Sequence, residues 1–81
     1  MATIAISMFL SSSTWEQDEQ HWAGTPEQAA RRIEQAFRSG KIVKLIEGAE
    51  RIELESKETE GRLTRFVGRV DGTNKLTITV F

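Results

Sequence analysis

The single histidine of this 81-residue chain, His21, lies in a polar segment beside the carboxylates of Asp18 and Glu19. An imidazole held by a carboxylate can act as a general base. Serine hydroxyls occur slightly earlier, at positions 11–13, and a hydroxyl activated by such a base could serve as a nucleophile. No recognised catalytic spacing connects these groups, however. We therefore expect no catalytic residues and a protein that is not an enzyme.

Metal and cofactor chemistry also lack the residues that they need. The chain has no cysteine and one histidine, so a zinc or copper site would depend almost entirely on carboxylates. The absence of cysteine also excludes disulfide bonds. The glycines are scattered among turns, and no glycine-rich phosphate loop follows a strand pattern. We expect no metal site and no bound cofactor.

Charged residues are unevenly distributed along the second half of the chain. Six glutamates occur between positions 47 and 60, whereas basic residues dominate positions 62–75. Neighbouring strands of a hairpin can pair such opposite charges across the sheet. We prefer this interpretation, because the acidic residues and the net charge of −1 would repel a polyanion. The alternative is a nucleic-acid-binding strip, whose candidate residues are Lys41, Lys44, Arg62, Arg65 and Arg69.

Two tryptophans, Trp15 and Trp22, stand in the otherwise polar segment around His21. Tryptophan offers a large apolar surface and one hydrogen-bond donor, and it is enriched at binding hot spots. A small domain can equally use both rings to close its core. We also consider a small ligand binder or enzyme with its pocket beneath a loop over residues 11–24.

The clearest local pattern predicts a helix over residues 26–39. Thr25 can cap its N-terminus, Pro26 suits the first helical position, and Gln28 completes a capping box. Gly40 suits the left-handed residue that ends a helix. An apolar stripe at spacings of three and four residues gives the helix one buried face, formed by Ala29, Ala30, Ile33, Ala36 and Phe37.

Apolar residues in strand-like patterns predict a sheet on either side of this helix in the sequence. The first strand covers residues 3–10, and a loop over 11–24 connects it to the helix. Short turns between the later strands favour an antiparallel meander. Its strands cover residues 41–47, 51–56, 62–70 and 75–81. The expected fold is a single α+β domain of order β-α-β-β-β-β, with one helix packed on one face of a mostly antiparallel, about five-stranded sheet.

The register of the hairpin between strands 51–56 and 62–70 decides which of its side chains face the helix. Pairing Ile52 with Phe66 points Phe66 and Val70 toward the helix, whereas the opposite choice would bury unpaired arginines. The other sheet face then carries apolar side chains that little of the chain is left to cover, which usually marks an interaction surface. The candidate interaction residues are Trp15, Trp22, Leu63, Val67 and Phe81.

A chain of this size buries a modest core, and small domains without disulfides often gain stability by oligomerising. The longest apolar stretch near the start, residues 2–10, is shorter than the roughly 20 residues of a membrane helix and has no basic leader. We therefore expect a cytoplasmic protein with no membrane association. The expected function is a protein-interaction or regulatory module that self-associates through its sheet and binds a protein partner.

Overall fold

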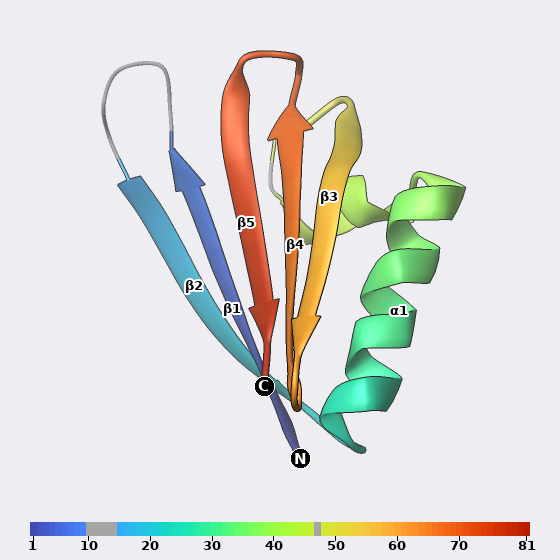
Figure 1. The fold of residues 1–81 in the computed structure, drawn as a ribbon. Coiled ribbons are helices and arrows are strands. Elements are labelled where there is room, and N and C mark those ends of the chain that lie inside the picture. Colours follow the sequence, from blue (N-terminus) through green and yellow to red (C-terminus); the bar gives the residue numbers. More distant parts are fainter. Residues whose placement is uncertain (10–14, 47) are drawn as a thin grey trace.

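The computed structural model describes residues 1–9, 15–46 and 48–81, with residues 15 and 16 described by their backbone alone. Within these residues, one α-helix packs on one face of a five-stranded antiparallel sheet, which confirms the predicted fold class. The strands lie in the spatial order β2-β1-β5-β4-β3 (Figure 1). They are β1 (Ala2–Phe9), β2 (Trp15–Trp22), β3 (Ile52–Glu60), β4 (Leu63–Val70) and β5 (Asn74–Val80), and the helices are α1 (Pro26–Ser39) and the 3-10 helix η1 (Lys41–Leu45).

Helix α1 begins and ends where its capping residues predict. The Thr25 hydroxyl accepts a hydrogen bond from the Gln28 backbone N–H at 3.2 Å, and the Gln28 side chain accepts one from the Thr25 backbone N–H at 3.0 Å. This reciprocal pair satisfies amide donors that the start of a helix leaves free. Gly40 ends the helix with a φ of 79°, which glycine adopts without a Cβ clash. The stripe residues Ala29, Ala30, Ile33 and Phe37 are buried, and Ala36 is half-buried.

The loop predicted over residues 11–24 is wrong for most of its length, because this segment contains the edge strand β2. β2 pairs with β1 from Ala2 opposite Trp22 to Phe9 opposite Trp15. The segment has no alternating apolar pattern, and for that reason it was not predicted as a strand. A strand at a sheet edge is held by backbone hydrogen bonds and can carry polar side chains on both faces. Residues 11–14 lie outside the described residues.

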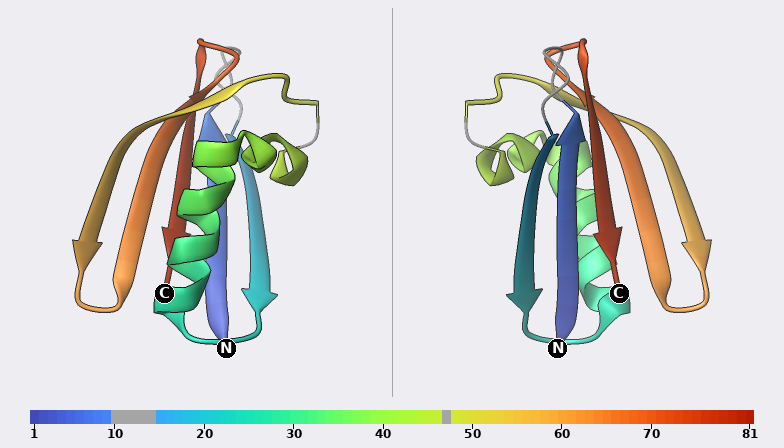
Figure 2. Two further views of the ribbon diagram at one scale, coloured as in Figure 1. Left: turned by 90° about the vertical axis from the view of Figure 1, so that its right-hand side faces the viewer. Right: turned by 90° about the vertical axis from the view of Figure 1, so that its left-hand side faces the viewer.

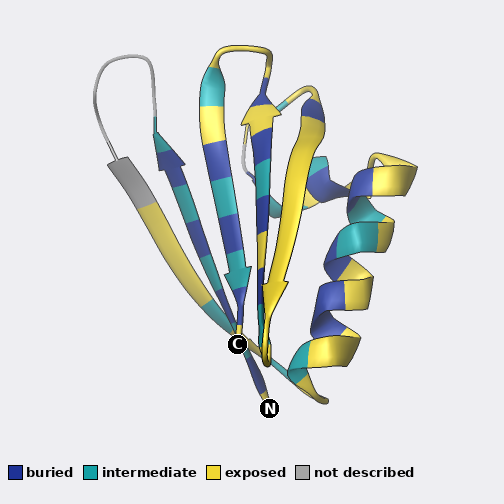
Figure 3. Ribbon diagram, viewed as in Figure 1, coloured by how far each residue is buried: buried dark blue, intermediate teal, exposed yellow. Residues whose placement is uncertain are grey.

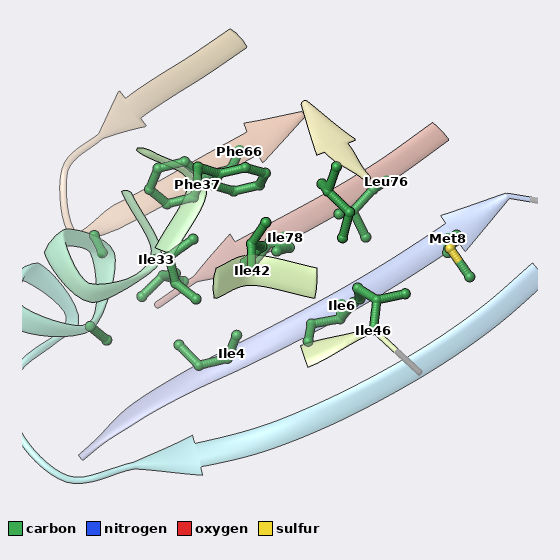
Figure 4. Packing of buried hydrophobic residues seen from close by; sticks show 14 of the residues in the cluster. Ile4, Ile6, Met8, Ile33, Phe37, Ile42, Ile46, Phe66, Leu76 and Ile78 are labelled. Atoms are coloured by element: carbon green, nitrogen blue, oxygen red, sulfur yellow. The ribbon is translucent and has the colours of Figure 1, made fainter. Parts of the chain in front are cut away.

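The strand predicted at residues 41–47 is also wrong, because Lys41–Leu45 forms the short helix η1. The strand β1 has β2 on one side and β5 on the other. The segment therefore packs its apolar side chains against the core instead of joining the sheet. Ile42 and Ile46 are buried in the same cluster as the apolar side chains of α1 and the sheet (Figure 4).

The hairpin of β3 and β4 has the predicted faces but a different register. Ile52 lies opposite Val70 rather than opposite Phe66, and Lys57 takes the place opposite Phe66. The predicted partner of Ile52, Phe66, and the observed partner, Val70, are four residues apart. Because a shift by an even number of residues does not turn a strand over, the same side chains point to each face. Ile52, Phe66 and Val70 are all buried toward α1, as predicted.

The changed register follows from the length of β3. The strand was predicted over residues 51–56 with a turn at 57–61, but it continues to Glu60 and turns at residues 61–62. A β-bulge interrupts the pairing between Leu54 and Ser56. The charged run after Ser56 resembles a turn in composition, but at a sheet edge its side chains are free to point into solvent.

The core lies between α1 and the sheet face that it covers, which we call the inner face. The colouring of Figure 3 shows buried and less buried residues alternating along β1, β4 and β5, whereas β3 is exposed along almost its whole length. The rings of Phe37 and Phe66 stack with their centroids 5.9 Å apart. The sheet contributes Ile4, Ile6 and Met8 from β1, Leu76, Ile78 and Val80 from β5, and Phe66 and Val70 from β4.

Gly68 sits where the bulge in β3 brings two strands close together. A Cβ at this position would lie 2.5 Å from the Glu53 carbonyl oxygen and 3.4 Å from a ring carbon of Phe37. Because the closer of these atoms belongs to the backbone, an added methyl group must displace β3.

We expect Gly68→Ala to lower the free energy of unfolding by about 1–3 kcal/mol, the usual cost of overpacking a close contact. Ser56→Ala, at an exposed position beside the same bulge, should change it by less than about 0.5 kcal/mol. Urea denaturation followed by circular dichroism measures both values. Equal stabilities for the two variants would show that β3 does not approach Gly68 this closely.

An ion pair ties the edge strand β3 to the flank of α1. Lys57 Nζ lies 2.5 Å from Glu34 Oε2, and an Arg38 guanidinium nitrogen lies 2.8 Å from Glu34 Oε1. Lys57 also lies over the Phe66 ring, 5.9 Å from its centroid. The hydrogen bond from Lys57 and its charge, assisted by the charge of Arg38, hold the pKa of Glu34 below its ordinary value against the opposing effect of desolvation.

We expect Glu34→Gln to lower the free energy of unfolding at neutral pH. A carboxylate whose pKa is lowered by folding stabilises the protein above its unfolded pKa, about 4.3 for glutamate, and this contribution is lost as the pH falls through the folded pKa. Wild type and Glu34→Gln should therefore converge in stability below that range. Denaturant titrations across the acid range, with Glu27→Gln as a control on the same helix, measure the difference. A pH-independent difference would rule out the ion pair as its cause.

Candidate interaction surfaces

The sheet face opposite α1, which we call the open face, has no described helix over it (Figure 2). Side chains alternate between the faces of a strand, so the register assigns each one to a face. At the centre of the open face the side chains are small, uncharged and half-buried. They are Thr3, Ala5 and Ser7 of β1, Thr77 and Thr79 of β5, and Val67 of β4.

Larger apolar side chains lie at the two ends of this face. Phe9 and Leu63 are half-buried, and Phe81 is 50% exposed. Residues 41–46, predicted as part of a strand, add no side chains to this face, because Ile42 and Ile46 pack in the core on the other side of the sheet. The open face is therefore a flat surface of hydroxyl, methyl and apolar groups rather than the apolar patch that the sequence predicted.

Trp22 does not cover the open face. Trp22 lies opposite the buried Ala2, which places it on the inner face, where it packs against the core. Its indole N–H donates a hydrogen bond to the Gln20 side chain at 3.0 Å. Trp15 begins β2, and its side chain lies outside the described part of the structure. Trp22 therefore lies on a different face from Leu63 and Val67.

The arginines of β4 border the open face beside the acidic strand β3. Arg65 lies opposite Glu58, and Arg69 forms an ion pair with Glu55. This arrangement agrees with the predicted pairing of opposite charges across the hairpin. A shallow depression crosses the face at this border, lined by Ser7, Glu58, Arg65, Val67, Lys75, Thr77 and Thr79.

The basic residues of the nucleic-acid alternative do not share one surface. Arg65 and Arg69 lie on the open face, and Arg62 lies in the turn between β3 and β4. Lys41 and Lys44 belong to η1, which packs on the opposite side of the sheet. Lys41 instead borders a second depression with residues of α1, namely Arg31, Arg32, Gln35, Ala36 and Ser39.

His21 is exposed at the edge strand β2. Its Nδ1 lies 3.4 Å from the Thr3 hydroxyl, and its Nε2 lies 3.5 Å from Glu19 Oε1. The serines at 11–13 lie outside the described residues. Where side chains are described, no group of three histidine, cysteine, aspartate or glutamate residues is placed to hold a metal ion. Neither described helix is long and apolar enough to cross a membrane.

The two outer strands of the sheet differ in how their free edges are protected. β3 carries a bulge, and its Lys57 points inward to Glu34 and Phe66. Bulges and inward-pointing charges are devices that discourage pairing with another chain. β2 pairs with β1 without a bulge over its whole length. The sequence did not predict the edge strand β2. The one signal for it was the length of the predicted loop over 11–24, which is unusual for so small a domain.

The open face and the edge of β2 are thus the two surfaces that the described residues leave available to a partner. One is broad and uncharged at its centre, and the other is a row of backbone groups. No protein-family model, no curated protein and no solved structure matches this chain.

Proposed function

We propose that this domain is a protein-interaction module that binds another polypeptide through the open face of its sheet. The observation that carries the proposal is the half-buried, uncharged centre of that face, which Thr3, Ala5, Val67, Thr77 and Thr79 form without a covering helix. An antiparallel sheet can leave one face in water, but solvent-facing positions are then usually charged or strongly polar. Here the open-face positions of β1 carry no charge, and on β4 and β5 the charged residues are Arg65, Arg69 and Lys75.

The composition of the centre favours contact with a protein. Threonine, alanine, serine and valine lose little side-chain entropy when they are covered. Their methyl groups gain from burial, and a hydroxyl can donate or accept a hydrogen bond according to its partner. Phe9 and Phe81, at the ends of the face, supply larger apolar groups of the kind that anchor interfaces.

The charged residues beside the uncharged centre indicate what charge the partner surface carries. Arg65 and Lys75 line the depression on the open face together with one carboxylate, that of Glu58. Charges at the rim of an interface change association rates and partner choice more than they change affinity. The partner that fits this face is therefore a flat protein surface, mixed in polarity at its centre and acidic where it meets Arg65 and Lys75.

Val67→Glu tests the proposal because it places a carboxylate at the centre of the open face. The matched control is Gln35→Glu, which adds the same charge at an exposed position of α1. In affinity capture from the native host, we expect a partner that wild type and Gln35→Glu recover equally and that Val67→Glu recovers at least tenfold less. Circular dichroism must show that all three proteins are folded.

A second readout locates the contact directly. Hydrogen exchange of the complex should slow at β1, β4 and β5 and leave α1 unchanged. Equal recovery by Val67→Glu, recovery of no specific partner, or protection confined to α1 and η1 would each contradict binding through the open face.

A further inference from the structure

The hydrogen-bond pattern of the sheet identifies which backbone groups of β2 point away from β1. Thr3 and Phe81 exchange two backbone hydrogen bonds, of 2.8 and 3.0 Å, so the odd-numbered residues of β1 direct their N–H and C=O groups toward β5. The even-numbered residues of β1 therefore face β2, where Ile4 lies opposite Gln20. It follows that the even-numbered residues of β2 bond to β1 and that Gln17, Glu19 and His21 direct their backbone groups outward.

The outward-facing backbone N–H and C=O groups of Gln17, Glu19 and His21 can pair with another strand. The side chains of Gln17, Asp18, Glu19 and His21 are exposed, and none of the described elements lies beside this edge of β2 in the sheet (Figure 1). The opposite edge, β3, is interrupted by a bulge, whereas β2 pairs without one. Strand addition is therefore directed to β2.

The residues along β2 favour one register over its neighbours for pairing with a second copy of the same strand. In an antiparallel pair of identical strands, a two-fold axis perpendicular to the sheet sets one residue opposite its own copy. An axis at Asp18 or at Glu19 would set two carboxylates against each other, which is unfavourable. An axis at Gln20 instead sets Glu19 of each copy opposite His21 of the other.

The same register leaves the hydrogen bonds inside β2 intact. Within each copy the Gln20 amide donates to Asp18 Oδ2 at 2.9 Å and accepts from the Trp22 indole N–H at 3.0 Å. The register sets Gln20 opposite its own copy and Asp18 opposite Trp22, so no two carboxylates of these residues face each other. Glu19 and His21 both direct their backbone N–H and C=O groups away from β1. When Glu19 of one copy lies opposite His21 of the other, these groups can therefore form the hydrogen bonds between the two strands.

We propose that a second copy of this chain adds to the edge of β2, antiparallel and centred on Gln20, so that two five-stranded sheets form one continuous sheet. The two-fold axis perpendicular to the sheet keeps both α1 helices on one side and both open faces on the other. The proposal does not depend on the open-face function, because it uses a different surface. If both hold, the dimer presents two adjacent copies of the binding face.

Sedimentation velocity tests the dimer over protein concentrations from about 1 µM to about 1 mM, the range expected for a small interface. We expect wild type to pass from monomer to dimer within this range. Glu19→Lys removes the acceptor that faces His21, and His21→Glu sets two carboxylates opposite each other, so each should weaken the dimer at least tenfold. The double variant Glu19→Lys/His21→Glu sets a lysine opposite a glutamate and should restore it. Glu60→Lys, the same charge change on β3, serves as the control.

Glu19→Pro tests the backbone directly. Its N–H points outward, so proline removes an intermolecular donor without removing a bond to β1, and proline is tolerated at such edge positions. We expect a folded protein that stays monomeric. A wild type that remains monomeric at every concentration, a dimer unaffected by Glu19→Pro, or failure of the double variant to restore association would overturn the proposal. A dimer lost only with Val67→Glu would place self-association on the open face instead.

Discussion

The pairing of β1 with β5 is the interaction on which the rest of the structure depends. It joins the β1–β2 hairpin to the β3–β4–β5 meander, and it places side by side the two strands that contribute most of the sheet's buried apolar residues. This junction supplies part of the apolar surface that α1 covers, and Phe37 extends the contact to Phe66 of β4. η1 occupies its place for the same reason, since Ile42 and the adjacent Ile46 complete a cluster that β1 and β5 begin.

The elements that the sequence predicted correctly are those whose signals are local. α1 is specified by Thr25, Pro26, Gln28 and Gly40, which all lie within or beside it. β4 and β5 are specified by alternating apolar residues and by the turn that starts at Asp71. The faces of the β3–β4 hairpin were also predictable, because burying Arg65 and Arg69 is costly.

The elements that escaped prediction depend on neighbours distant in the sequence. The polar strand β2 exists because β1 offers it a hydrogen-bonding edge, and residues 41–45 are helical because that edge is taken. The register of β3 depends on a bulge opposite Gly68, which no composition signal marks. For the same reason, Val67 and Phe81 could be named as surface candidates from the sequence, whereas the outward-facing backbone groups of β2 could not.

The position of β5 in the sheet has a consequence for how the chain folds during synthesis. β5 follows every other described strand in the sequence, yet it is the middle strand of the sheet. Until the ribosome has released it, the hairpin of β1 and β2 has no partner, and the apolar side of α1 has no complete surface to cover. Contacts between residues so far apart in sequence also form slowly. The nascent chain must therefore carry exposed isoleucines until β5 emerges, and it is in this interval that chaperone binding would protect it.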